Sequence, residues 1–441
     1  MIVEHAVARC SGQSLMAFLI ASVILLPCSY ADAASSWSID AVVDGNTIYW
    51  MDFANAVAVD SRNIPHVVFN YDHDSHRVLR YGVLSDGEWT FSEIATNVGV
   101  SFCSIAIDPD DKVNVAYYDD GQSQVYYATV SNGLWSVGPV GSWEWSWGSV
   151  SYASIVPSLA LDRQGHPYIA VHTTDGNSSL KIYSNLNGTW GTEVVPSLRN
   201  VSIPYIAFDS SNVLHVIYQK YLGEEKVIHA WRTGGSWTNE TLNLTKIPLT
   251  WMLSTGIDSR DRVHLCYVAL SNGQESDYGN LDYCIMHAWK HGDSWSEEVA
   301  YPGPSLSTMS MAISSEDVLQ LSFQDSLNTD LMYASNAGGH WTAQRVDSVD
   351  YVGYRSSIAL GPANQVHILY FNETGMSVKY ATGSGALVGE NAGVSGLLGA
   401  SLVVGSAVVA FVVGMLLGRI GKSSVGRPDD SKKPPPPPDS R

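Results

Sequence analysis

The stretch Ser104-Ile-Ala-Ile-Asp108 decides the fold, because variants of it recur seven times along the chain at intervals of 47 to 56 residues. Each copy alternates small and apolar residues and ends in a turn residue, a pattern typical of a short β-strand followed by a tight turn. The copies are Ala56-Val-Ala-Val-Asp60, Ser104-Ile-Ala-Ile-Asp108, Ser158-Leu-Ala-Leu-Asp162, Tyr205-Ile-Ala-Phe-Asp209, Ser254-Thr-Gly-Ile-Asp258, Ser310-Met-Ala-Ile-Ser314 and Ser357-Ile-Ala-Leu-Gly361.

Three further strands follow each copy. The second often opens with His, as in His215-Val-Ile-Tyr218, and a Gly-containing turn leads to a fourth strand that opens with Trp, as at Trp237. A repeat of about 40–50 residues with four strands is typical of a β-propeller blade. One such sheet is apolar on both faces, so it needs neighbouring blades on both sides to be stable.

The two ends of the repeat array complement each other. The seventh unit stops near Thr382 without its Trp strand, and the missing strand matches Ser36-Trp37-Ser-Ile-Asp-Ala-Val-Val43 at the other end of the array. We therefore predict an all-β chain: a single seven-bladed β-propeller of four-stranded antiparallel blades over residues 36–382. The N-terminal strand closes the ring, and one C-terminal transmembrane helix follows it.

The Trp-containing repeat resembles those of sialidase-type (Asp-box-like) and lectin-like propellers. Sialidases carry Ser-x-Asp-x-Gly-x-x-Trp at the turn before the fourth strand, and this chain has shortened relatives such as Asp86-Gly-Glu-Trp89 and Gly292-Asp-Ser-Trp295. The resemblance implies the propeller fold. Sialidase activity would also need three Arg, a Tyr paired with a Glu, and an Asp acid; of the arginines only Arg355 falls clearly on the expected binding face, so the activity does not follow.

Both ends of the chain indicate export and anchoring. Residues 1–33 resemble a signal peptide, with Arg9 before an apolar run and an A-x-A pattern at Ala31-Asp32-Ala33; an uncleaved anchor helix is the alternative. After a linker at 383–393, the 24 uncharged residues 394–417 are long enough to cross a bilayer. The basic, Pro-rich tail 418–441 then lies in the cytoplasm and the propeller outside. Gly414-Met-Leu-Leu-Gly418 also permits a helix-mediated dimer.

Charge and composition narrow the partners. The formal net charge of −19 opposes binding to nucleic acid. Cys103, Cys266 and Cys284 remain after signal removal, and a disulfide between the last two stays open. No metal-ligand spacing and no cofactor motif is present, so we expect neither. Six N-x-S/T sequons suit an exported, glycosylated protein, at Asn177, Asn187, Asn200, Asn239, Asn243 and Asn372.

Candidate binding residues gather in the predicted fourth-to-first and second-to-third connections, which emerge on the same face of a propeller. Aromatic rings and carboxylates on that face would bind sugar hydroxyls or peptides. In the alternative interpretation, the aromatics fill the central channel and the acids only solvate its rim. The candidates are Trp143, Glu144, Trp145, Trp147, Trp251, Tyr354, Arg355, Asp119 and Asp120.

Three functions remain after this reasoning. The first is a non-catalytic cell-surface protein that binds an extracellular glycan, peptide or protein. The alternatives are a surface glycoside hydrolase or lyase of sialidase-like architecture, whose catalytic residues the sequence does not identify, and a structural envelope protein. The His residues at the recurrent second-strand position, His66, His215, His264 and His367, are expected to make structural hydrogen bonds rather than bind metal.

Overall fold

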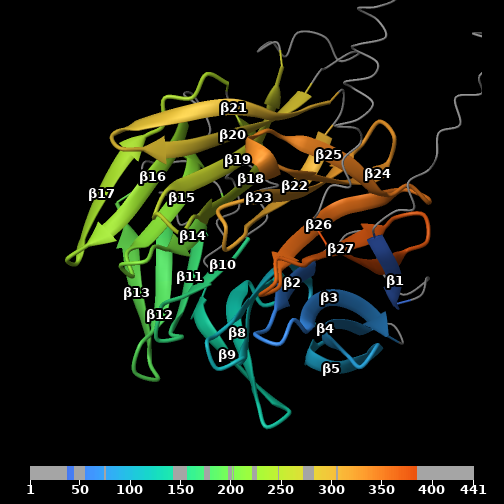
Figure 1. Cartoon of the computed structure of the whole chain (residues 1–441). Coiled ribbons are helices and arrows are strands. Elements are labelled where there is room, and N and C mark those ends of the chain that lie inside the picture. Colours follow the sequence, from blue (N-terminus) through green and yellow to red (C-terminus); the bar gives the residue numbers. More distant parts are fainter. Residues whose placement is uncertain are drawn as a thin grey trace, which may run out of the picture. The chain divides into compact units, whose positions relative to one another are not determined.

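The computed structural model describes residues 37–43, 55–73, 76–142, 156–172, 179–196, 201, 203–220, 226–246, 248–271, 283–303 and 306–384. These residues form seven separate four-stranded antiparallel sheets, which are the seven blades of a β-propeller (Figure 1). The seven-bladed, all-β prediction is confirmed. Residues 394–417, predicted to form a transmembrane helix, lie outside the described part, and within that part no helix is long and apolar enough to cross a bilayer.

The blades follow the sequence repeat. Blade 1 contains β2 (Asn55–Val59), β3 (Pro65–His73), β4 (His76–Ser85) and β5 (Glu88–Thr96). Blade 2 contains β6 (Val100–Ile107), β7 (Val113–Asp119), β8 (Gln124–Ser131) and β9 (Leu134–Ser142). Blade 3 contains β10 (Ser158–Leu161), β11 (Pro167–His172), β12 (Leu180–Asn185) and β13 (Trp190–Val195). Blade 4 contains β14 (Tyr205–Phe208), β15 (Leu214–Lys220), β16 (Lys226–Thr233) and β17 (Ser236–Thr241).

The remaining blades have the same composition. Blade 5 contains β18 (Pro248–Ile257), β19 (Val263–Leu270), β20 (Tyr283–His291) and β21 (Ser294–Gly303). Blade 6 contains β22 (Leu306–Ile313), β23 (Leu319–Asp325), β24 (Asp330–Ser335) and β25 (Thr342–Asp347), with a 3₁₀ turn η1 (Ala337–Gly339) before the last strand. Blade 7 contains β26 (Val352–Leu360), β27 (Val366–Asn372), β28 (Ser377–Gly383) and β1 (Trp37–Val43).

Strand β1 closes the ring as predicted. It pairs antiparallel with β28, and Trp37 lies opposite Gly383 in the register. A Cβ atom at Gly383 would come within 2.8 Å of the Trp37 ring, so glycine is needed there to admit the indole. The first strands of successive blades contact each other around the ring, and β2 contacts both β6 and β26. In Figure 1 the first and last strands of the chain lie together in one blade.

Blade-to-blade packing supplies the core. Second strands such as β7 and β19 are buried along their whole length, because a neighbouring blade covers each of their faces. The hydrophobic clusters combine side chains from adjacent blades, as where β3 and β27 contribute Phe69 and Phe371 to the same cluster. The fourth-strand Trp of a blade packs edge-on against a third-strand ring of the preceding blade, as Trp135 does on Tyr81 with centroids 5.2 Å apart.

The recurrent second-strand His makes the structural hydrogen bond expected of it. His66 and His367 bond the hydroxyls of Tyr81 and Tyr380 in the third strand, and Gln320 bonds Tyr333 in the same way. In blades 4 and 5 the third-strand partner is a second His. There the bonds extend into four-residue relays, Asp209–His215–His229–Glu240 and Asp258–His264–His287–Glu298. Within the described residues no His, Cys, Asp and Glu gather into a metal-binding group.

Turns between first and second strands join neighbouring blades. The Asp that ends a first strand accepts hydrogen bonds from backbone N–H groups two and four residues later, as Asp60 does from Arg62 and Ile64. The fourth turn residue has positive φ and reaches the preceding blade, as Asp111 does when it accepts a hydrogen bond from the Ser61 N–H. The same contact recurs at Arg163–Asn212, Ser210–Asp261, Ser259–Asp317 and Ser315–Asn364.

The three described cysteines are free thiols. Cys266 packs in the cluster between blades 5 and 6, whereas Cys284 packs in the cluster between blades 4 and 5. The two side chains therefore lie on opposite faces of one sheet, which answers the question left open by the sequence. Burial raises the pKa of Cys103 to about 12, so this thiol is protonated at neutral pH.

Candidate functional site

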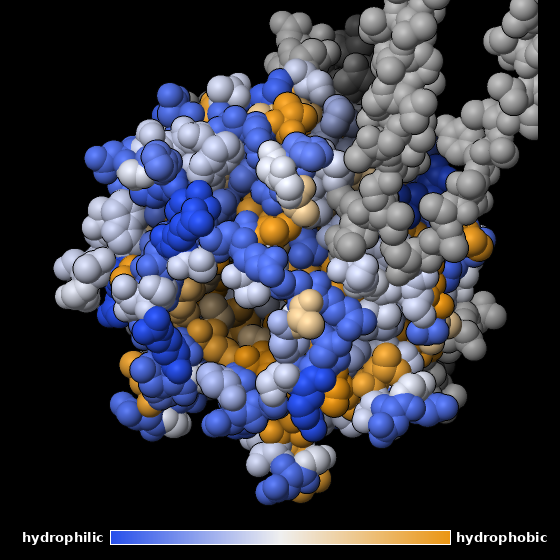
Figure 2. Space-filling model, in the orientation of Figure 1, coloured by the Kyte–Doolittle hydropathy of each residue, from blue (hydrophilic) through white to orange (hydrophobic). Residues whose placement is uncertain are grey.

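A cavity of about 480 Å³ opens inside the ring at the start of the seven first strands. Every blade contributes to its wall through the residues just before and at the start of its first-strand motif. These residues belong to the ends where fourth-to-first connections enter, which is the face that the sequence predicted for binding. The space-filling view shows a hollow with apolar residues in its wall (Figure 2).

The cavity wall is built in three levels that follow the repeat. Two residues before the motif stand Phe102, Val156, Ile203, Met252, Thr308 and Arg355. The next level is formed by Asn55, Cys103, Pro157, Pro204, Leu253, Met309 and Ser356. The motif's own first residues follow, Ala56, Ser104, Ser158, Tyr205, Ser254, Ser310 and Ser357. Among these described lining residues, Arg355 is the only charged side chain.

The serine hydroxyls of the third level join neighbouring blades. Ser254 accepts a hydrogen bond from the N–H of Met311 in the next blade, and Ser310 accepts one from Ile358. The same contact links Ser104 to Leu159, Ser158 to Ile206 and Ser357 to Val57. Each hydroxyl oxygen accepts one hydrogen bond from an N–H group and has a second lone pair that can accept another. The ring of serines therefore also offers polar atoms to the cavity.

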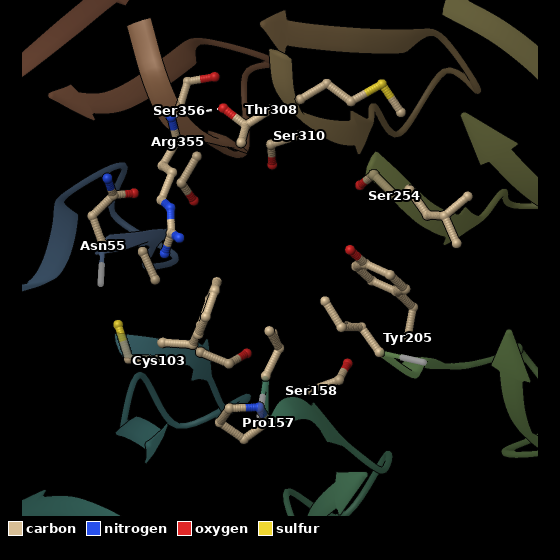
Figure 3. Close-up of a pocket in the computed structure, with 18 of the residues that line it drawn as sticks. Asn55, Cys103, Pro157, Ser158, Tyr205, Ser254, Thr308, Ser310, Arg355 and Ser356 are labelled. Atoms are coloured by element: carbon tan, nitrogen blue, oxygen red, sulfur yellow. Dashed lines mark hydrogen bonds between the residues drawn. The ribbon is translucent and has the colours of Figure 1, made fainter. Parts of the chain in front are cut away.

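Arg355 is held at the cavity by an irregular part of β26. The register of β26 shifts on both sides of Tyr354, which marks bulges that re-aim side chains. Arg355 itself has φ of +47°, an uncommon conformation for a residue other than glycine. Its backbone N–H donates to Thr308 Oγ1 at 2.7 Å, and its guanidinium carbon lies 4.3 Å from the centre of the Phe102 ring, in blade 2. Figure 3 shows the side chain extending into the opening beside Asn55.

We expect Gly353→Ala to destabilise the propeller and to disturb Arg355. Gly353 has φ of +90°, and an added Cβ would lie 2.9 Å from the Leu331 backbone of blade 6. The cost should be about 1–3 kcal/mol of unfolding free energy, measured by urea denaturation. Gly133→Ala is the matched control, because Gly133 also has positive φ but would place its Cβ in open space. Equal losses in the two variants would show that the contact with Leu331 does not matter.

The structure brings together only part of the predicted site. Tyr354 and Arg355 line the cavity, although they belong to the bulged strand β26 rather than to a connection. Trp251 likewise lies within a strand, β18, because the first strands of blades 5 and 7 begin earlier than the motif does. Trp143, Glu144, Trp145 and Trp147 lie outside the described residues.

The two predicted acids lie away from the cavity wall. Asp119 is 1% exposed, and its carboxylate accepts hydrogen bonds from the Gly99 and Gly121 N–H groups and from the Gln122 amide. Asp120 is exposed, and its N–H donates to the Gly99 carbonyl. Asp119 therefore organises the turn after β7 and its contact with blade 1, as a buried, fully bonded carboxylate does.

The sequons differ in accessibility. Asn187, Asn239 and Asn243 are exposed. Asn372 is 4% exposed, and its amide nitrogen donates to Asp350 Oδ2 at 2.9 Å. Asn177 and Asn200 lie outside the described residues. The exposed asparagines can present their amide nitrogens to a modifying enzyme, whereas Asn372 would first have to leave its buried site.

Sequence reasoning missed Phe102, Thr308 and Asn55, which meet at the cavity from three different blades. Phe102 and Thr308 stand two residues before their motifs, as Arg355 does, and Asn55 stands one residue before its own. Aligning these positions across all seven repeats would have identified the wall. Both side-chain polar atoms of Asn55 are buried without a hydrogen-bond partner, as is the hydroxyl of Ser356.

No protein-family model matches this sequence. No curated protein matches it either.

Solved structures share the fold. The BP39L lectin from Burkholderia pseudomallei is similar over 76% of this chain and 97% of its own, with 12% identity and a TM-score of 0.55. A PL25 ulvan lyase bound to -[GlcA(1-4)Rha3S]- is similar over 78% of this chain and 95% of its own, with 12% identity and a TM-score of 0.51. An α-l-arabinofuranosidase from Fusarium graminearum reaches 9% identity over 64% of this chain and 92% of its own, with a TM-score of 0.44. The chain is therefore a seven-bladed β-propeller of the architecture that lectins and polysaccharide lyases also use.

Proposed function

We propose that this protein is anchored in the cell membrane by residues 394–417 and binds an extracellular saccharide on the face where the cavity opens. The observation that carries the proposal is the cavity wall, which combines aromatic rings, a ring of serine hydroxyls and one guanidinium around about 480 Å³. Ligand pockets of about 300–1,000 Å³ typically combine apolar walls with a few placed polar groups.

Each kind of group in the wall has a counterpart on a sugar. Hydroxyls such as those of Ser254, Ser310 and Tyr205 bond sugar hydroxyls, and Figure 3 shows these three around the opening. Phe102 and Tyr354 offer ring faces, which pack against the apolar C–H surface of a pyranose. The groups that the described wall supplies hold and orient a ligand, so binding is the function that we infer for it.

Filling the cavity should abolish binding. Val156 is half-buried in the wall, and a Trp side chain at this position would occupy the opening. We therefore expect Val156→Trp to lose binding to the glycans that the wild-type protein retains on an array. Val137→Trp is the matched control, since Val137 is 40% exposed on the outer strand β9. The full-length protein in detergent serves for both. Retained binding in Val156→Trp would place the site elsewhere, and hydrolysis or elimination of a bound glycan would identify an enzyme instead.

The proposed anchoring has a separate test. Protease added to intact cells should remove the propeller and leave a fragment that contains the tail 418–441. Glycosidase treatment of the same cells should raise the protein's electrophoretic mobility if the exposed sequons carry glycans. A propeller protected from external protease would contradict the proposed orientation.

A further inference from the structure

We propose that the outer surface between blades 5 and 6 binds a primary ammonium group on an unbranched alkyl stem, the group that a lysine side chain or a polyamine carries. The ammonium lies over the indole rings of Trp289 and Trp341 and donates hydrogen bonds to the Glu298 carboxylate. None of these residues lines the cavity, so the site is separate from the one that the proposed function uses. The neighbouring contact between blades 4 and 5, where the chain supplies its own ammonium, carries the proposal.

The contact between blades 4 and 5 shows how such a group is held. The Lys290 ammonium lies 2.5 Å from Glu240 Oε1. It also lies 5.7 Å from the ring centre of Trp231 and 5.9 Å from that of Trp295. A cation within about 6 Å of an aromatic ring centre is attracted by the negative face of the ring. The Trp295 indole N–H donates to the same Glu240 oxygen at 3.2 Å. Two indoles and one carboxylate therefore hold a primary ammonium here.

The contact between blades 5 and 6 repeats these groups one blade further along the chain. The corresponding residues are Trp289, Glu298 and Trp341. The Trp341 indole N–H donates to Glu298 Oε1 at 2.8 Å. Trp289 stacks on His287 with ring centres 4.8 Å apart, and Trp341 meets the same imidazole edge-on at 5.7 Å. The matching distances around His229 are 4.9 and 5.9 Å, so the two contacts place their indoles in nearly the same way.

The two contacts differ in the cation. Blade 6 has Asn336 at the repeat position of Lys290, and the Asn336 amide oxygen accepts a hydrogen bond from a backbone N–H of its own blade. Within the described part of the chain, Glu298 forms an ion-pair contact only with His287. Burial lowers the pKa of His287 to about 4, so this imidazole is neutral at pH 7. The Glu298 side chain is 44% exposed, whereas that of Glu240, which pairs with Lys290, is 25% exposed.

The neighbouring contacts also indicate which cation fits. Between blades 3 and 4 a single indole, that of Trp237, and the Arg232 guanidinium both bond Glu193. Where a second indole stands beside the carboxylate, as Trp231 does, the chain places a lysine ammonium instead. The contact between blades 5 and 6 has two indoles, so an ammonium is the group that matches it. The formal net charge of −19 attracts cations of this kind from solution.

The first test uses ligands that share one alkyl chain. Butylammonium, butylguanidinium and 1-butanol are titrated at pH 7 and low ionic strength into the full-length protein in a neutral detergent, and binding is followed by calorimetry. We expect butylammonium to bind at least about tenfold more tightly than 1-butanol, because only the cation is attracted by the carboxylate and by both rings. Butylguanidinium should bind more weakly than butylammonium. Equal affinity for butylammonium and 1-butanol, or tighter binding of butylguanidinium, would overturn the proposal.

Variants assign the binding to this contact. Glu298→Gln should weaken butylammonium binding at least about tenfold, because it removes the charge but keeps an acceptor for His287 and Trp341. Glu93→Gln is the matched control: Glu93 also lies on a fourth strand, and its side chain is 45% exposed, so both variants remove one negative charge at similar exposure. Unchanged affinity in Glu298→Gln, or equal losses in the two variants, would place the site elsewhere. Thermal unfolding of each variant verifies folding.

The repeat offers a second test that leaves Glu298 intact. Lys290→Ala removes the ammonium from between Trp231 and Trp295, so the contact between blades 4 and 5 should become a further site for the amine. Because a ligand raises stability according to the sites it fills, butylammonium chloride should raise the unfolding temperature of Lys290→Ala more than that of the wild-type protein. Sodium chloride at equal concentration is the control. An equal rise in the two proteins would show that two indoles and a carboxylate do not suffice.

Further arms identify the source of the ammonium and separate this site from the cavity. Tighter binding of Nα-acetyl-lysine methylamide than of spermidine would assign the site to a lysine of a partner protein, and the reverse would assign it to a free polyamine. Val156→Trp should leave butylammonium binding unchanged, because Val156 lies in the cavity wall. Loss of amine binding in that variant would overturn the proposal, whereas loss of glycan binding alone bears only on the proposed function.

Discussion

Trp37→Ala should lower the free energy of unfolding by about 3–5 kcal/mol, the cost of truncating a buried Trp. Trp37 is 7% exposed, packs edge-on against Tyr333 of blade 6 with centroids 5.2 Å apart, and fits against Gly383. Because domains are stable by only about 5–15 kcal/mol, the loss should be visible as a large shift of the urea midpoint. Tryptophan fluorescence and circular dichroism would both report it.

A control on the same strand separates the effect of removing the buried indole from a general sensitivity of β1 to side-chain truncation. Ile39 pairs with Ala381 but is 36% exposed, so Ile39→Ala should cost less than about 1 kcal/mol. If both variants lose the same stability, the effect comes from the strand itself and not from the buried indole. If neither loses stability, β1 does not hold the ring closed.

Acidification should unfold the propeller between pH 6.5 and about 4. Burial lowers the pKa of His172, His229, His287 and His367 from 6.5 to about 4. Between these values the unfolded chain binds more protons than the folded one, so stability falls as pH falls. One pKa unit corresponds to about 1.4 kcal/mol, so each of these buried imidazoles adds to the loss of stability as the pH falls. Urea midpoints measured at steps from pH 7 to pH 4 would show the decline.

The repeat itself provides the variants for this prediction. Blade 6 has Gln320 where blade 7 has His367, and Gln320 bonds Tyr333 at 2.6 Å as His367 bonds Tyr380. His367→Gln should therefore keep the hydrogen bond and reduce the acid sensitivity, whereas Gln320→His should increase it. Stability that is constant from pH 7 to pH 4 in all three proteins would show that these imidazoles are protonated without cost in the folded state.

Ring closure was predictable because the incomplete seventh repeat and the N-terminal strand together make one complete repeat unit. A β-strand depends on a neighbour, and the Trp strand missing after Thr382 was present at Trp37. The His positions were predictable for the same reason, since Asn114 and Gln320 occupy them in other blades and share only hydrogen-bonding capacity with His. The second relay members His229 and His287 were not paired in advance, because register across a hairpin is set by the turn.

The cavity was only partly predictable. Tyr354 and Arg355 were identified from their place before a first strand, but Phe102 and Thr308 meet Arg355 through the closed ring, far from it in sequence. Asp119 was predicted from its charge and its place in a connection on the expected face. It is instead 1% exposed, because backbone N–H groups of its own turn and of the turn before β6 both need an acceptor. Composition does not show which carboxylates accept backbone hydrogen bonds within a turn and are therefore not available to a ligand.

The two kinds of contact between blades, at the motif serines and at the first turns, complement each other. Pro109 and Pro362 have no N–H to donate at the turns joining blades 2 to 3 and 7 to 1, but Ser104 and Ser357 connect those joints at the other end. Where Ala56 and Tyr205 replace the serine, Asp111 and Asp261 make the turn contact. Each of the seven joints between neighbouring blades therefore carries such a hydrogen bond at one end or both, so that separating two blades anywhere in the ring would break at least one of them.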